Sequence, residues 1–121
     1  MKNSRLFFAL LGFLTSAGFC SAQDQKLSSQ DVDYFEKKVR PLLAKRCYSC
    51  HSKDAKIVQG GLKLDSATSL KKGGDSGPAI AAGKPDESLL ISAIRYEDLE
   101  MPPKGKLPAA EIAELTAWVK R

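Results

Sequence analysis

Two cysteines and a histidine stand close together near the middle of this 121-residue chain, in the sequence Cys47-Tyr48-Ser49-Cys50-His51. The C-x-x-C-H spacing is typical of a covalent attachment site for c-type haem. Residues three and four apart share one face of a helical turn, so both thiols can reach one edge of a porphyrin while His51 turns toward the iron. The motif predicts one covalent haem c, attached at Cys47 and Cys50 and bound through its iron by His51.

Two other kinds of site use the same residue types, and the sequence favours neither. A thioredoxin-like redox pair belongs to a βαβ context, which the residue pattern around the motif lacks. A structural zinc site needs four ligands, whereas the chain after residue 22 offers only Cys47, Cys50 and His51 from its cysteines and histidines. The haem interpretation therefore leads.

The choice of a second iron ligand is narrow because His51 is the only histidine, which excludes a haem with two histidine ligands from this chain. Met101 is the one methionine beyond the first residue, and Pro102 and Pro103 follow it. These prolines favour an extended, stiff loop that can present the thioether. We predict that His51 and Met101 both bind the iron, as in electron-transfer cytochromes. The alternative is that Met101 only fills a gap in the core.

The elements that must position these residues are helices. A three-to-four-residue apolar spacing predicts a helix before the motif, and Pro41 should kink it or split it. The residues of this stripe are Val32, Phe35, Val39, Leu42 and Leu43.

Three more helices are expected. One covers residues 66–72 with Asp65 or Ser66 as its cap, and a second starts at Pro85-Asp86, with Asp86 as its cap, and runs toward residue 96. A third starts at Pro108, and its apolar stripe consists of Ile112, Leu115, Trp118 and Val119. No stretch alternates like a strand. The sequence predicts an all-α, cytochrome c-like fold of about four helices with long loops around one covalent haem.

Two supporting roles can be assigned from the pattern. Phe35 and Trp118 should pack the first and last helices together and cover one haem edge; a hydrogen bond from Trp118 to a haem propionate is the lesser alternative. The carbonyl of Pro78 is a candidate acceptor for the second nitrogen of His51, and an ordinary turn is the alternative.

The first 22 residues have the pattern of a secretory signal peptide: Lys2 and Arg5, an apolar stretch at 6–14, and small residues ending at Ala22. We therefore expect an exported, periplasmic protein. It would associate with the membrane only if this segment stays uncleaved. Lipidation at Cys20 is disfavoured by the bulky Phe19 before it.

The remaining chain divides into a short polar tether, 23–30, and one domain, 31–121. Cleavage after residue 22 would lower the formal net charge from +5 to +3 by removing two basic residues. This mild excess gives no support to nucleic-acid binding. Eight loop lysines form either a docking rim for an acidic redox partner or simply a solvated surface. They are Lys53, Lys56, Lys63, Lys71, Lys72, Lys84, Lys104 and Lys106.

The haem motif together with Met101-Pro102-Pro103 resembles the planctomycete-type cytochrome c domain. The similarity runs from about Val32 to Lys120, and it includes the segments 35–43, 60–65, 83–85 and 88–90 and the closing Trp118-Val119 helix. The resemblance implies a cytochrome c fold with Cys47 and Cys50 as thioether anchors, His51 as proximal ligand and Met101 as distal ligand. Such domains are often fused to much larger regions, whereas this chain ends right after its last predicted helix. We therefore expect a free carrier or a separate subunit.

An iron with two side-chain ligands has no open site, and no acid or base stands near the motif to process a substrate. We therefore expect an electron carrier between a redox protein donor and acceptor, and not an enzyme. One alternative is a haem enzyme or gas sensor in which Met101 is not on the iron. Another is a structural or docking subunit of a larger exported complex.

Overall fold

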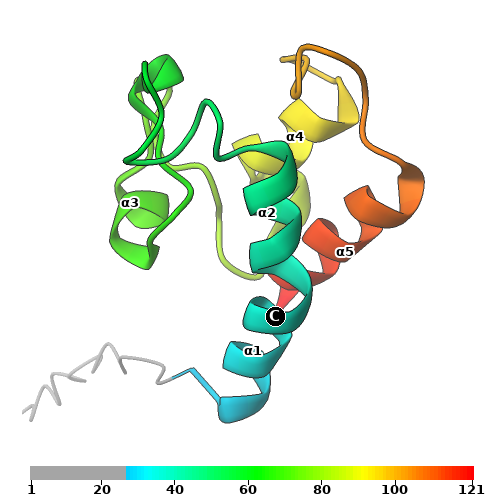
Figure 1. The fold of residues 1–121 in the computed structure, drawn as a ribbon. Helices are drawn as coiled ribbons and strands as arrows, with labels where there is room; N and C mark the ends of the chain where they lie inside the picture. The colour runs from blue at the N-terminus through cyan, green and yellow to red at the C-terminus, as the bar shows by residue number, and fades with distance from the viewer. Residues whose placement is uncertain (1–26) are drawn as a thin grey trace, which may run out of the picture.

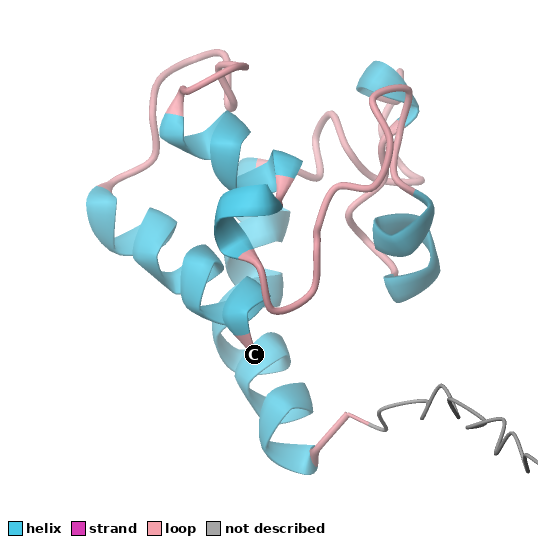
Figure 2. Ribbon diagram, turned by 180° about the vertical axis from the view of Figure 1, so that it is seen from behind, coloured by secondary structure: helices cyan, strands magenta, loops and turns pink. Residues whose placement is uncertain are grey.

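The computed structural model describes residues 27–121. The predicted signal peptide and residues 23–26 of the predicted tether lie outside the described residues. Between residues 27 and 121 the chain forms helices joined by long loops and no strand, apart from an isolated β-bridge between Gly74 and Gly77. Figure 2 shows this arrangement. The α-helices occupy four stretches of chain, which confirms the all-α prediction.

The first stretch is one long helical run. It consists of α1 (Ser29–Tyr34), a π-helical segment (Phe35–Val39) and α2 (Arg40–Arg46). Ser28 caps the run, because its hydroxyl accepts a hydrogen bond from the N–H of Asp31 at 3.1 Å.

Pro41 does not end this run, although it alters the hydrogen bonding. A proline has no N–H to donate, and just before it the N–H of Arg40 donates to Phe35 O, five residues back. The predicted interruption is therefore a change of hydrogen-bond register over Phe35–Val39, and the helix continues to the cysteine motif.

Two of the other predicted helices are confirmed. α3 covers Ala67–Lys72, and Ser66 caps it by accepting a hydrogen bond from the N–H of Ser69 at 3.1 Å. α5 covers Ala109–Lys120 and follows Pro108. Their caps and apolar stripes are local features of sequence, which is why the pattern located them.

The remaining helix begins later than predicted. Pro85–Glu87 forms a single 3₁₀ turn, and α4 covers Leu89–Arg95 with Ser88 at its N-cap position. Asp86 is not the cap; its carboxylate instead pairs with Arg95 at 2.8 Å. The Ser88 hydroxyl donates to Lys84 O at 2.8 Å, which ties the 3₁₀ turn to the start of α4.

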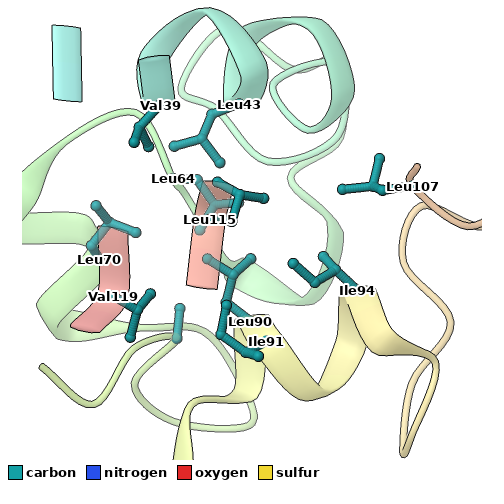
Figure 3. Close-up of a cluster of buried hydrophobic side chains, with 11 residues drawn as sticks. Val39, Leu43, Leu64, Leu70, Leu90, Ile91, Ile94, Leu107, Leu115 and Val119 are labelled. Atoms are coloured by element: carbon teal, nitrogen blue, oxygen red, sulfur yellow. The ribbon is translucent and has the colours of Figure 1, made fainter. Parts of the chain in front are cut away.

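One apolar core joins these helices (Figure 3). Val39, Leu43 and Leu115 are completely buried, and Ile91 packs with them from α4. The rings of Phe35 and Trp118 lie 5.5 Å apart between centroids, which confirms that they pack the first and last helices together. Other buried members of the core are Leu64, Leu70, Ala79, Leu90, Ile94, Leu107 and Val119.

The fold has two parts on opposite sides of α2. Figure 1 shows α3 and the loops around it on one side, and α4 and α5 on the other. The cysteine motif lies directly after α2, so it sits where the two parts meet. Within residues 27–121, no helix has the length and apolar character needed to cross a bilayer.

Candidate haem-binding site

The cysteine motif forms a hydrogen-bonded turn directly after α2. The N–H of Cys47 donates to Leu43 O at 2.8 Å. The N–H of His51 then donates to Cys47 O at 2.9 Å, and that of Cys50 to the same oxygen at 3.1 Å. These bonds across three and four residues give the turn that the spacing predicted, with both cysteines as free thiols.

A cavity of about 570 Å³ opens beside this turn and brings the four predicted site residues together. Cys47, Cys50 and His51 line it from the motif, and Met101 lines it from the loop after α4. The sequence separates Met101 from the motif by some fifty residues, and the fold closes that distance. The cavity is within the usual size range of cofactor sites, roughly 300–1,000 Å³.

The walls of this cavity are mainly apolar. Leu62 and Leu64 line it from the loop after the motif, and Leu90 and Ile94 line it from α4. Among the described residues of the lining none is acidic, whereas Lys45, Arg46 and Lys104 are basic. Two thiols, one imidazole and one thioether around an apolar space fit a covalently attached haem, whose ring is apolar and whose iron takes nitrogen and sulfur ligands.

His51 is held by the loop that follows the motif. Its Nδ1 lies 3.3 Å from the carbonyl oxygen of Leu62, and its own carbonyl accepts from the N–H of Leu64 at 2.9 Å. A carbonyl only accepts, so this contact places the ring proton on Nδ1 and leaves the Nε2 lone pair available to a metal. Such a bond fixes the orientation of the ring and makes it a stronger ligand.

The sequence offered Pro78 for this role, and that hypothesis is wrong. Pro78 is exposed, and the chain running beside His51 is the segment around Leu62. No side-chain signal pointed to Leu62, because the accepting group is a main-chain carbonyl that every residue carries.

The Met101 loop is attached to the end of α4. The N–H of Met101 donates to Ala93 O at 3.1 Å, and the hydroxyl of Tyr96 donates to the carbonyl of Pro102. Tyr96 itself ends the helix with a left-handed backbone at φ 63°. From the sequence, residue 96 marked only the end of a predicted helix, and no pattern predicted that Tyr96 holds the methionine loop.

Arg46, directly before the motif, places a positive charge near Cys47. This side chain makes a two-pronged ion pair with Glu111 of α5, with both N···O distances 2.9 Å, and the bond holds the pKa of Glu111 below its ordinary value. Burial raises the pKa of the Cys47 thiol to about 11, although the nearby Arg46 opposes the rise. The free thiol of Cys47 is therefore protonated at neutral pH.

A second, larger hollow of about 1040 Å³ borders the motif at Tyr48 and Ser49. It is lined by polar and charged residues such as Arg40, Lys53 and Asp65, together with Tyr48, whose buried hydroxyl has no hydrogen-bond partner among the described residues. Neither a cysteine nor a histidine lines it, so it cannot provide the thioether anchors of haem c. The smaller cavity is the candidate site.

Comparison with protein families supplies an independent observation. The family model described as planctomycete cytochrome C matches residues 47–105. The chain carries a planctomycete cytochrome c domain. No match is found among curated proteins or among solved structures.

The matched segment of this cytochrome c domain begins at Cys47 and includes Cys50, His51 and Met101. The resemblance expected from the motifs is thereby confirmed over this segment, while the helices before Cys47 and after Gly105 lie outside it. Cytochrome c domains transfer electrons by means of haem, and the spacing of Cys47 and Cys50 is consistent with a covalent haem site.

Proposed function

We propose that this chain is an exported monohaem c-type cytochrome that carries single electrons between redox proteins. One observation supports this most strongly: the two thiols of the motif, the only histidine and Met101 line the same apolar cavity. In this proposal Cys47 and Cys50 hold the haem by thioether bonds, His51 is the proximal ligand and Met101 is the distal ligand. A bound haem supplies an iron that gains and loses one electron.

The surrounding residues serve the cofactor in two ways. The carbonyl of Leu62 keeps the proton of His51 on Nδ1, so that Nε2 is the iron ligand. Leu64, Leu90 and Ile94 give the cavity apolar walls, and an apolar environment affects the potential of a bound haem.

We propose a carrier and not an enzyme because the cavity offers few groups for acid–base chemistry. None of its described lining residues is a carboxylate, and His51 is already used as a ligand. If His51 and Met101 both bound the iron, as proposed here, no position would be left open for a substrate.

The partner that we propose is an acidic redox protein. Lys45, Arg46 and Lys104 line the cavity, and Lys104 and Lys106 are exposed beside the methionine loop. Opposite charge on a partner would accelerate its association, and salt would screen that attraction. Electron transfer to an acidic partner should therefore slow as ionic strength rises, whereas reduction by a small neutral reagent should not.

Export is proposed from the N-terminal pattern alone, and haem attachment on the outer side of a bacterial membrane requires it. N-terminal sequencing of the haem-containing protein tests the predicted cleavage after Ala22. A mature chain beginning at Gln23 in the periplasmic fraction would support it, and haem protein that is found only in the cytoplasm would contradict it.

The optical spectrum of the purified protein tests the haem assignment. We expect covalent low-spin haem, a sulfur-to-iron charge-transfer band in the oxidised state and no binding of carbon monoxide in the reduced state. Replacing Met101→Ala should abolish the band and admit carbon monoxide. Leu99→Ala is the matched control, because Leu99 lies in the same loop, 48% exposed and away from the cavity lining.

The possible results separate the candidate functions. High-spin wild-type haem that readily binds carbon monoxide would favour the haem enzyme or gas sensor. Absence of covalent haem would remove the central proposal, and a Met101→Ala protein indistinguishable from wild type would remove Met101 as a ligand.

A further inference from the structure

Two glycine-rich segments meet next to Leu62, the residue whose carbonyl accepts from His51. One is residues 59–62, which contain Gly60 and Gly61, and the other is residues 73–77, which form a turn closed by the Gly74–Gly77 bridge. We call this pair of segments the glycine clasp. The haem cavity uses Gln59 and Leu62 from the first segment and none of the second.

The clasp is closed by direct backbone contact. The N–H of Asp75 donates to Gly60 O at 2.8 Å. A Cβ atom at Gly74 would lie 2.3 Å from that same Gly60 oxygen, 2.9 Å from the Cβ of Leu62 and 3.0 Å from the nitrogen of Leu62. No side chain fits there without moving the backbone, so the approach of the two segments requires glycine at position 74.

Leu62 connects the clasp to the haem site. Its nitrogen and Cβ are the atoms against which Gly74 packs, and its carbonyl oxygen accepts from Nδ1 of His51 at 3.3 Å. The N–H of Leu64, two residues on, donates to the carbonyl of His51 at 2.9 Å. The position of this short segment therefore decides whether the imidazole keeps its hydrogen bond.

We propose that the glycine clasp is a positioning device for the proximal ligand: close packing of Gly74 on Leu62 fixes the carbonyl that orients His51 and strengthens it as an iron donor. This inference rests on the proposed function, because it takes His51 to be the iron ligand. Gly74 is a positioning residue, and it acts through Leu62 without touching the cavity.

The variant Gly74→Ala tests the clasp in the haem-loaded protein. The added methyl group must push residues 60–62 away, which lengthens the bond to His51. A weaker hydrogen bond makes the imidazole a poorer donor, so the oxidised iron is stabilised less and the reduction potential should rise. In the reduced protein the Nδ1 proton of His51 should also exchange faster with solvent, as followed by NMR.

Gly83→Ala is the matched control. Gly83 has a positive φ of 77°, so alanine strains its backbone, yet nothing lies within 4 Å of the added carbon and the residue is outside the clasp. We expect this variant to lose stability and to keep the wild-type potential and proton exchange. The comparison separates ligand positioning from general destabilisation.

A second variant covers the case in which Gly74→Ala does not fold. Replacing the amide between Leu62 and Lys63 by an ester weakens the Leu62 carbonyl as an acceptor, and the N–H that it removes donates no hydrogen bond within residues 27–121. The reduction potential should again rise.

Failure of the proposed function would be visible in the wild type alone, as absent covalent haem. A wild type with low-spin haem, combined with variants that keep its potential and proton exchange, would overturn the clasp and leave the carrier intact.

Discussion

The two parts of this small protein are each stabilised by a different kind of interaction. The helical frame, made of the run 29–46 with α4 and α5, is built by apolar side chains from distant positions, among them the fully buried Leu43 and Leu115. The loop lobe, residues 52–84 with α3, contributes Leu64, Leu70 and Ala79 to the core. Much of the lobe is fixed by main-chain hydrogen bonds, by glycines that pack closely against neighbouring backbone, and by the N-cap of a short helix.

This contrast explains where the site lies. The frame supplies a stable platform, since Cys47 follows directly from α2 and Leu90 and Ile94 line the cavity from α4. The lobe supplies orientation, because its Leu62 carbonyl reaches His51. Stability should therefore respond mainly to changes in the frame. The orientation of His51, the proposed iron ligand, should respond mainly to changes in the lobe.

The largest effect on stability is expected from the core of the frame. Leu115→Ala removes a side chain that is 0% exposed, and we expect the free energy of unfolding to fall by about 2–5 kcal/mol, through lost burial and the cavity left behind. Urea unfolding of the haem-loaded protein, followed by circular dichroism, measures the loss. The low-spin spectrum of the folded variant should stay unchanged.

Leu89→Ala is the control for that substitution, because Leu89 is 37% exposed at the start of α4. Its cost should stay below about 1 kcal/mol. Equal losses for the two variants would contradict the view that the frame depends on its buried apolar contacts.

The helices of the frame were predictable because their signals are local and repeated. The stripe through Leu115 and Val119 located α5, and the spacing of Phe35 and Val39 located the first run. The π-helical register before Pro41 was not predictable in detail, since a missing N–H allows a kink, a break or a register change. At α4, Asp86 has the right chemistry for a cap, but its pairing with Arg95 and the preceding 3₁₀ turn depend on tertiary contacts.

A smaller and more local effect is expected in the loop lobe. Ser66→Ala removes the hydroxyl that accepts from the N–H of Ser69 at the start of α3, a loss of about 0.5–2 kcal/mol in such caps. Hydrogen exchange should accelerate at the amides of Leu70 and Gly73, which donate within this helix and at its end. Exchange in α5 should change less.

Ser66→Asp is the rescue variant, because a carboxylate also accepts from the first turn of a helix. It should restore slow exchange in α3. If Ser66→Ala instead accelerated exchange equally in α3 and α5, the lobe and the frame would be one cooperative unit and the distinction between them would fail.

The candidate site was predictable to the extent that its chemistry is carried by side chains. The C-x-x-C-H spacing named Cys47, Cys50 and His51, and the lone methionine named Met101, all of which line one cavity. The supporting groups were not predictable, because the Leu62 carbonyl is a main-chain atom. The tyrosine that holds the methionine loop had no spacing that distinguishes it from a surface tyrosine.

The Arg46–Glu111 ion pair joins α2 to α5 within the frame, beside the first cysteine. The hydrogen bond from Arg46 lowers the pKa of Glu111 from its ordinary value of 4.5. A carboxyl group whose pKa is lowered by folding stabilises the folded state when it is ionised. The contribution is therefore complete above pH 4.5 and is lost as the pH falls through the lowered pKa.

The smallest expected effect is on thermal stability, through the ionised carboxylate of Glu111. Glu111→Gln should lower the unfolding midpoint slightly at neutral pH, and the difference from wild type should shrink as the pH falls below the ordinary carboxyl range, because protonation removes the same charge from the wild type. Thermal unfolding across a series of acidic pH values measures this difference.

Glu114→Gln is the control on the same helix, since Glu114 makes no ion pair among the described residues. This variant should follow the wild-type profile. A difference between Glu111→Gln and wild type that persists undiminished in acid would show that Glu111 joins the helices by packing and not by charge. The frame would then be held by apolar contact up to the edge of the proposed haem site.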